Sequence, residues 1–170
     1  MGSKARILHC GERAFSVELA DEIDENVNLR IITLAEDLKA DPPDGLVELI
    51  PSYRSLLVCF NPGRITGKAM ERVLLDRLDQ VDTPRESTGA LWHIPAVYGG
   101  EIGLDFDDLA YEKSLSPPEL IKLHSSPTYR IYMIGFAPGF CYLGGLPEAL
   151  HTPRLPQPRP IIPQGAIGIG

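Results

Sequence analysis

The stretch Ala14–Leu38, AFSVELADEIDENVNLRIITLAEDL, changes its hydrophobic period part of the way along. Its first residues alternate, with Phe15, Val17 and Leu19 apolar and their neighbours small or polar. Alternation of this kind predicts a strand with one buried face. The later apolar residues recur at spacings of four, three and four: Val27, Ile31, Leu34 and Leu38. That spacing predicts an amphipathic helix, so the stretch as a whole indicates an α+β fold.

The segments that follow this stretch repeat both patterns. Short β-prone runs occupy 46–50 and 55–60, and Pro51–Arg54 between them predicts a hairpin or bulged connection. Thr66 is a candidate N-cap for a second helix. The apolar stripe of that helix is Met70, Val73, Leu74 and Leu78. Residues 1–84 are therefore expected to form a small two-layer α/β sandwich.

The polar segment 82–89, DTPRESTG, lacks hydrophobic periodicity and contains both proline and glycine, so it predicts a linker. We place a domain boundary there, with a second domain over 85–170. The patterns in that domain predict two strands and two helices: a strand over 91–98, a helix over 106–112, a capped helix from Ser116 to His124 and a strand over 129–136. Beyond them, seven prolines between Pro138 and Pro163 exclude a helix.

Composition narrows the class of protein. The 170 residues carry a net charge of −7, and an acidic chain lacks the clustered Lys and Arg of a general nucleic-acid surface. No apolar run approaches the ~20 residues of a membrane span. Three widely spaced cysteines, Cys10, Cys59 and Cys141, form no zinc or dithiol motif. We therefore expect a cytoplasmic protein that binds no metal, nucleic acid or membrane.

The end of the sequence is locally cationic. Glu148 is the last acidic residue, and the final 22 residues contain His151, Arg154 and Arg159. Prolines around both arginines fix the backbone, so two guanidinium groups are held ready for a carboxylate or phosphate. The predicted substrate- or phosphate-binding residues are Arg154, Arg159, His151 and Gln164. An equally weighted alternative is that the arginines cap carbonyls or pair with acids elsewhere in the fold.

An aromatic and glycine-rich segment, GFAPGFCYLGG, occupies 135–145 and is expected to be a loop after a strand. Its predicted pocket residues are Phe136, Pro138, Phe140 and Tyr142. The alternative is that these aromatic residues plug one end of a small barrel. Cys141 beside them is expected to be a small buried hydrophobe rather than a nucleophile. The sequence has neither a P-loop nor a dinucleotide fingerprint, so ATP would need another kind of site or a partner.

Other polar residues carry weaker signals. His9, His93 and His124 occur singly and are expected to be packed or surface residues rather than metal ligands. An acidic group precedes and begins a predicted helix, where it is expected to meet the helix dipole: Glu101, Asp105, Asp107 and Asp108. No nucleophile and base can be paired from sequence, so the catalytic residues are not assigned.

Several of these segments together resemble one known family. In the second half they are GFAPGF at 135–140, YLGGL at 142–146, HTPR at 151–154, and Pro158-Arg159 leading to Gly165. In the first half and after the linker they are GERA at 11–14, PSYRSLLV at 51–58 and IPAVYGGE at 94–101. The set, in this order and over nearly the whole chain, resembles the B subunit of 5-oxoprolinase, a family also called allophanate hydrolase subunit 1.

The resemblance implies an N-terminal α+β domain followed by a cyclophilin-like β-barrel. It also implies ATP-dependent opening of 5-oxo-L-proline to L-glutamate together with separate A and C subunits. ATP would activate the unreactive lactam oxygen, and Arg154 and Arg159 would steady the substrate carboxylate or a phosphate. Two departures stand out: Cys141 replaces a proline common in the family, and family members continue past Gly170 with further strands. The barrel is therefore expected to be incomplete.

Two other functions fit the same resemblance. The related family includes an inhibitor of a sporulation histidine kinase, which is a regulatory binding protein. A carboxyltransferase component of a biotin-dependent urea carboxylase is the third candidate, although it normally sits in a much longer chain. Neighbouring reading frames for A and C subunits would favour the oxoprolinase, and an adjacent histidine kinase would favour regulation.

Overall fold

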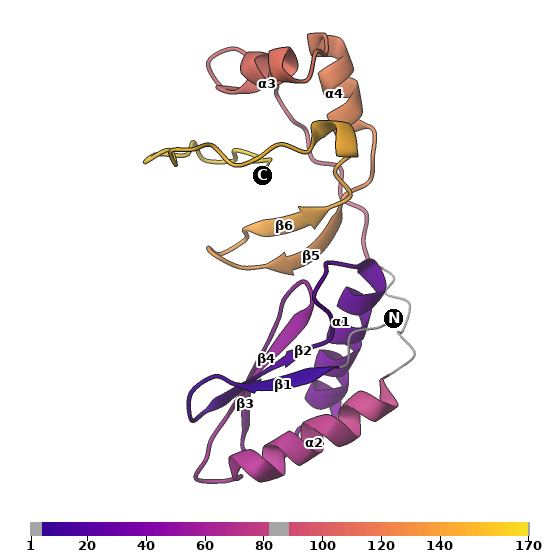
Figure 1. Cartoon of the computed structure of the whole chain (residues 1–170), viewed down its shortest axis with the longest axis vertical. Helices are drawn as coiled ribbons and strands as arrows, with labels where there is room; N and C mark the ends of the chain where they lie inside the picture. Colours follow the sequence, from indigo (N-terminus) through magenta and orange to yellow (C-terminus); the bar gives the residue numbers. More distant parts are fainter. Residues whose placement is uncertain (1–4, 82–88, 170) are drawn as a thin grey trace. The chain divides into compact units, whose positions relative to one another are not determined.

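The computed structural model describes residues 5–81 and 89–169 (Figure 1). They divide into two compact units. The first contains the described residues of Met1–Gly89 with Tyr132–Tyr142, and the second contains Ala90–Ile131 with the described residues of Leu143–Gly170. The predicted linker falls almost wholly on 82–88, outside the described residues. The domain boundary between 84 and 85 therefore stays a prediction.

The first unit is built on a four-stranded sheet in the order β1-β2-β4-β3. Its strands in chain order are β1 (Arg6–His9), β2 (Ala14–Glu18), β3 (Leu46–Pro51) and β4 (Ser55–Phe60). Neighbouring strands run antiparallel, and Phe15 lies opposite Val58 in the central pair. The predicted strand that begins at Ala14 is confirmed, and so is the hairpin between the next two β-prone runs.

Two helices complete this unit: α1 (Glu25–Ala40) and α2 (Gly67–Gln80). The Asp24 side chain accepts hydrogen bonds from two backbone N–H groups in the first turn of α1. Thr66 accepts one from the first turn of α2, as predicted. Both caps satisfy N–H groups that a helix leaves without partners at its start.

The core of the first unit lies between one face of the sheet and both helices. Twelve buried residues form it: Phe15, Val17, Leu19, Ile31, Leu34, Leu38, Leu56, Val58, Phe60, Met70, Leu74 and Val81. The strand members alternate along β2 and β4, so they share one face of the sheet. Burial of each large side chain contributes about 1.5–3 kcal/mol relative to exposure. The predicted two-layer α+β architecture is therefore confirmed for this unit.

The second unit contains helices α3 (Phe106–Glu112) and α4 (Pro117–Ser125) and a single 3-10 turn, η1 (Glu148–Leu150). Both helices were predicted. At the start of α4 the Glu119 carboxylate accepts the backbone N–H of Ser116 at 2.8 Å, which confirms the capping box. The buried residues that join these elements are Ala110, Leu120 and Leu150.

Strands β5 (Arg130–Ile134) and β6 (Cys141–Gly144) pair as a two-stranded sheet. The predicted strand over 129–136 is confirmed with shorter bounds, but the predicted loop over 135–145 is in part the strand β6. The strand expected over 91–98 is wrong, because this segment is irregular throughout. No strand pairs with it in the described residues, and Trp92 is 73% exposed. Two strands make no barrel, so the cyclophilin-like barrel is not observed.

Candidate functional site

Five aromatic rings form a continuous row in the first unit. In order along the row they are Tyr132, Tyr53, Tyr142, Phe140 and Phe136, with successive ring centroids 5.5, 5.8, 5.0 and 5.6 Å apart. Tilted and edge-to-face contacts at these distances are favourable beyond simple burial. Three predicted pocket residues thus come together, and Tyr53 and Tyr132 extend the set. Phe136 at the end of the row is 90% exposed.

A tight turn holds the exposed end of this aromatic row. The Phe140 N–H donates to Ala137 O at 3.0 Å, with Pro138 and Gly139 between them. Gly139 has φ +78°, as the third residue of a type II turn requires. The Gly135 N–H closes the base by donating to Phe140 O at 2.9 Å. Phe136 adopts φ +59°, which is uncommon for a residue with a side chain, so the backbone of the turn is strained at this position.

Asn28 ties the aromatic row to helix α1. Its fully buried side-chain Nδ2 donates to the backbone oxygens of Ser52, Tyr53 and Tyr132, at 3.1, 3.3 and 3.3 Å. Its Oδ1 has no hydrogen-bond partner among the described residues. Sequence reasoning missed this residue, although a signal was present: Asn28 is three positions before Ile31, on the face that the apolar spacing marks as buried.

In the second unit, the Arg159 side chain forms a two-pronged ion pair with Asp105, the residue just before α3. Hydrogen bonding from the guanidinium lowers the pKa of Asp105 and raises the pKa of Arg159. One of the two alternatives weighed for the arginines, pairing with an acid elsewhere in the fold, therefore describes Arg159 in this structure. Its role as a ligand for substrate or phosphate stays a prediction.

The other three residues of the predicted cationic set make different contacts. Arg154 is exposed and has no carboxylate partner in the described part of the chain. His151 Nε2 lies 3.0 Å from Leu146 O, and its backbone oxygen accepts a hydrogen bond from Lys113 Nζ at 2.6 Å. Gln164 is exposed. Among the described residues no hydrogen bond joins any two of the four predicted ligands, so a shared site is not preassembled.

A partly buried polar cluster in the second unit was not predicted. The Tyr98 hydroxyl lies 2.7 Å from His124 Nδ1, and the Tyr129 hydroxyl donates to His124 O at 2.7 Å. Burial lowers the pKa of His124 and raises the pKa of both tyrosines. Each shift favours the neutral form of its group, and a neutral His124 whose proton is on Nε2 accepts the Tyr98 hydroxyl hydrogen at Nδ1. His124 is thus a packed histidine, as expected, and its tyrosine partners are new.

The remaining sequence candidates divide into confirmed and corrected ones. Asp107 and Asp108 lie in the first turn of α3, which confirms their expected place near the positive end of the helix dipole. Cys141 was expected to be buried, and this is wrong: its thiol is free and exposed. The reason is that Cys141 belongs to β6, whose side chains alternate between the two faces of the hairpin. Within 5–81 and 89–169, no group of three or more His, Cys, Asp or Glu is placed to hold a metal.

With the fold and these groups described, comparison with known proteins gives the class. Residues 5–170 match the family of the carboxyltransferase domain, subdomain C and D, so the chain belongs to this family. It is similar to two proteins named as the B subunit of 5-oxoprolinase, from Bacillus subtilis (strain 168) and Escherichia coli O157:H7. The Bacillus protein is 34% identical over 99% of this chain and 75% of its own length. The Escherichia protein is 39% identical over 98% of this chain and 75% of its own length.

Solved structures share the fold of this chain. The crystal structure of TTHA0988 is 34% identical, matches 89% of this chain with a TM-score of 0.73, and is covered over 29% of its own length. The chain therefore corresponds to less than a third of that protein. Urea amidolyase of K. lactis matches 77% of this chain and 9% of its own, at 18% identity and a TM-score of 0.56, which shows a shared fold alone. No described helix has the length and apolar character needed to cross a bilayer.

Proposed function

We propose that this chain is the B component of an ATP-dependent 5-oxoprolinase and opens 5-oxo-L-proline to L-glutamate together with A and C subunits. The observation that carries the proposal is the similarity, over 98–99% of the chain, to two proteins named as the B subunit of 5-oxoprolinase. The name of those relatives implies a complex of several subunits. No comparison favours the histidine-kinase inhibitor or the urea carboxylase component.

Within this proposal, Arg154 holds the substrate carboxylate or a phosphate. Support comes from its exposed position without a carboxylate partner in the described residues, whereas Asp105 occupies the guanidinium of Arg159. Arg159 would first hold the proline-rich segment in place and could engage a ligand only by releasing Asp105. His151 and Gln164 belong to the same proposed site.

The aromatic row of the first unit is proposed by itself as a pocket wall, formed by Phe136, Pro138, Phe140 and Tyr142. Its fixed turn supports this role, because a preorganised wall loses little entropy on binding. ATP is proposed to bind mainly through the partner subunits, since the chain has no P-loop. The protein is expected to work in the cytoplasm.

The segment 85–170 is proposed to be part of a cyclophilin-like barrel with strands in addition to β5 and β6. Support comes from large apolar side chains that are each more than 70% exposed: Trp92, Ile94, Val97, Ile161 and Ile162. Large aromatic and β-branched side chains are more often buried than this in folded proteins. Inside a closed barrel, alternate residues of this kind would face the interior.

The test of the proposal is reconstitution. The chain is co-expressed with the A and C subunits encoded beside it, and ATP-dependent glutamate release is measured for the complex and for each component alone. Activity is expected only in the complex. Arg154→Ala should lower kcat by on the order of 10²-fold, as loss of one preorganised donor does. ATP-dependent glutamate release by the isolated chain, or full kcat in the Arg154 variant, would contradict the proposed roles.

A further inference from the structure

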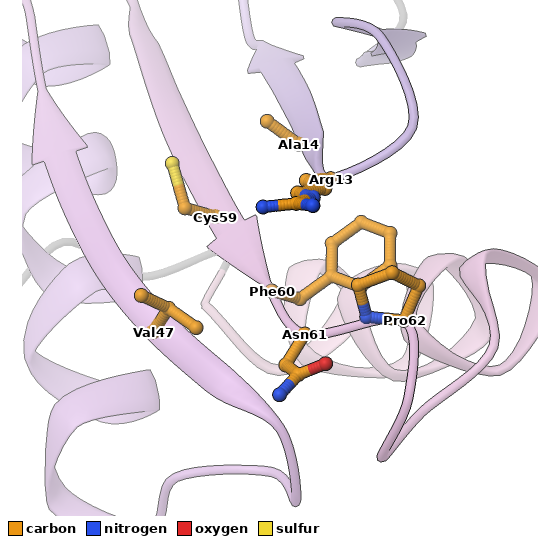
Figure 2. Close-up of a pocket in the computed structure, with 7 residues that line it drawn as sticks. All are labelled: Arg13, Ala14, Val47, Cys59, Phe60, Asn61 and Pro62. Atoms are coloured by element: carbon orange, nitrogen blue, oxygen red, sulfur yellow. The ribbon is translucent and has the colours of Figure 1, made fainter.

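A hollow of about 580 Å³ opens at the end of the sheet in the first unit, beside β2, β3 and β4 (Figure 2). Arg13 and Asn61 bring polar side chains to it, and Val47, Cys59 and Pro62 bring apolar surface. Arg13 belongs to the GERA motif that contributed to the family resemblance. The function proposed above uses none of these residues.

The hollow has a cause in the register of the sheet. Leu46 lies opposite Phe60 and Glu48 lies opposite Cys59, so Val47 is an extra residue in β3. Such a bulge interrupts pairing and bends the strand. Val47 is 67% exposed at this point, although it is a β-branched apolar residue. The fold itself therefore opens this end of the sheet.

The two polar groups stand on fixed backbone. Arg13 O accepts the Phe60 N–H at 2.8 Å, and the Asn61 N–H donates to Gly45 O at 2.8 Å. Asn61 Oδ1 accepts the Gly63 N–H at 2.9 Å, which leaves Nδ2 as the free donor of this amide. Within the described residues, neither that Nδ2 nor the Arg13 guanidinium has a hydrogen-bond or ion-pair partner. Two exposed side-chain donors without acceptors in the described residues thus border the same hollow.

The surrounding charges limit what can bind. Arg13 is the one cation among the described residues that line the hollow. Glu48 lies opposite Cys59 in the sheet, so an acid stands near one side. Burial, the charge of Glu48 and the neighbouring Cys10 raise the pKa of the Cys59 thiol, which keeps it neutral and apolar. A dianion would meet one cation and a repelling carboxylate, whereas a monoanion matches the single guanidinium.

We propose that this hollow binds a small monocarboxylate. The carboxylate accepts hydrogen bonds from the Arg13 guanidinium, whose planar fork matches its two oxygens, and from Asn61 Nδ2. A short apolar chain lies against Val47 and Pro62.

The experiment is an NMR titration of the whole chain with butyrate, and with butyramide and inorganic phosphate as controls. Butyrate should give saturable shifts at the backbone amides of Arg13, Val47, Cys59 and Asn61, with a Kd in the millimolar range typical of so few atoms. Butyramide should give none, because it lacks the charge. Phosphate should bind more weakly than butyrate.

Three variants make the assignment specific. Arg13→Met should weaken butyrate binding at least tenfold, since it removes a charge-assisted hydrogen bond. Asn61→Asp keeps the acceptor for the Gly63 N–H but replaces the Nδ2 donor with a negative oxygen, so it should abolish binding while the spectrum stays native. Arg72→Met removes an exposed arginine from α2 and should leave the Kd unchanged.

Several results overturn the proposal: shifts that do not saturate, equal binding of butyramide, tighter binding of phosphate, or a loss of affinity in Arg72→Met as large as in Arg13→Met. Unchanged affinity in a folded Asn61→Asp protein also overturns it. If Arg13→Met fails to fold, Asn61→Asp decides the question alone. None of these results depends on oxoprolinase activity, so failure here leaves the function proposed above untouched.

Discussion

The two units of this chain bury very different amounts of apolar side chain. The first unit has a core of twelve buried residues between its sheet and its two helices. The second buries three of its described residues, Ala110, Leu120 and Leu150, and leaves several larger apolar side chains in water. Similar hydrophobic patterns therefore produce a core only where a second layer is present to cover them. The first unit has that layer among its own elements, and the second has little of it.

Polar contacts have a larger share in holding the second unit together. The Tyr98–His124 contact, the Arg159–Asp105 ion pair and the bond from Lys113 Nζ to His151 O each join segments distant in sequence. A hydrogen bond of this kind contributes about 0.5–1.5 kcal/mol net, less than one large buried side chain. We therefore expect the second unit to open more readily than the first.

The largest expected effect comes from the core of the first unit. Leu34→Ala removes a fully buried side chain from α1 and should cost about 2–5 kcal/mol, measured as loss of protection from hydrogen exchange in β2 and β4. The matched change Leu120→Ala should cost less in the second unit, because fewer atoms surround the cavity that it leaves. Equal losses at the two positions would break the comparison between the units.

Asn28→Ala should have the next largest effect. Three backbone oxygens lose their shared donor inside the protein, at a cost of about 1–3 kcal/mol. Hydrogen exchange should rise most in β5, where Tyr132 lies, and less in β2. Asn26→Ala is the control, because Asn26 is exposed on the same helix and only its backbone is used in the cap. A uniform rise over the whole first unit would show that Asn28 holds no particular segment.

The first unit could be predicted from sequence because its signals are local. Hydrophobic period identified the strand at Phe15 and the helix at Ile31, and cap chemistry identified Thr66 and, in the second unit, the box at Ser116. Each of these depends on residues within one or two turns of the chain. The segment 91–98 is largely apolar, as a buried strand is, yet a strand also needs a pairing neighbour, and sequence does not say whether one is present.

The sequence predicted several residues of the candidate site but not which of them contact one another. The aromatic residues of 135–145 were recognised, whereas Tyr53, 79 residues before Tyr132 in the chain, joins their row through the tertiary fold. Arg159 was recognised as a cation, but its partner Asp105 is 54 residues away. Contacts at such separation depend on the fold, and a single sequence carries no direct sign of them.

A smaller effect is expected from pH, and it should appear in the second unit alone. Burial places the pKa of His124 below its ordinary value of 6.5, so the unfolded chain takes up a proton more readily than the folded one. The stability contributed by neutral His124 is present above pH 6.5 and is lost as the pH falls through that value toward the lowered pKa. Urea unfolding between about pH 7.5 and 5.5, followed by hydrogen exchange in α4, should show this loss.

Variants identify the group responsible for that pH dependence. His124→Asn should remove the change in α4, whereas the same substitution at exposed His93 should preserve it. Tyr98→Phe removes the hydrogen bond at His124 Nδ1, so it should lower stability at about pH 7.5. The further loss of stability on acidification should then be smaller than in the parent protein. A pH dependence that survives in His124→Asn would assign the titration to another residue.

The smallest effect on stability is expected from the two arginines of the cationic segment. Both lie in the second unit, and their alanine variants are compared with each other. Arg159→Ala breaks the pair with Asp105, but both side chains are substantially exposed, at 36% and 48%, and exposed ion pairs contribute little. Its effect should be visible at low salt and smaller at about 1 M salt, because salt weakens the attraction between exposed charges. Arg154→Ala has no such pair to break among the described residues and should unfold like the parent at both salt concentrations.

Melting temperatures at the two salt concentrations test this, with Asp105→Asn as the reciprocal variant. A salt-independent loss in Arg159→Ala that exceeds the loss in Asp105→Asn would mean that the guanidinium supports the segment by packing, and the ion pair would then not explain how the proline-rich chain is held.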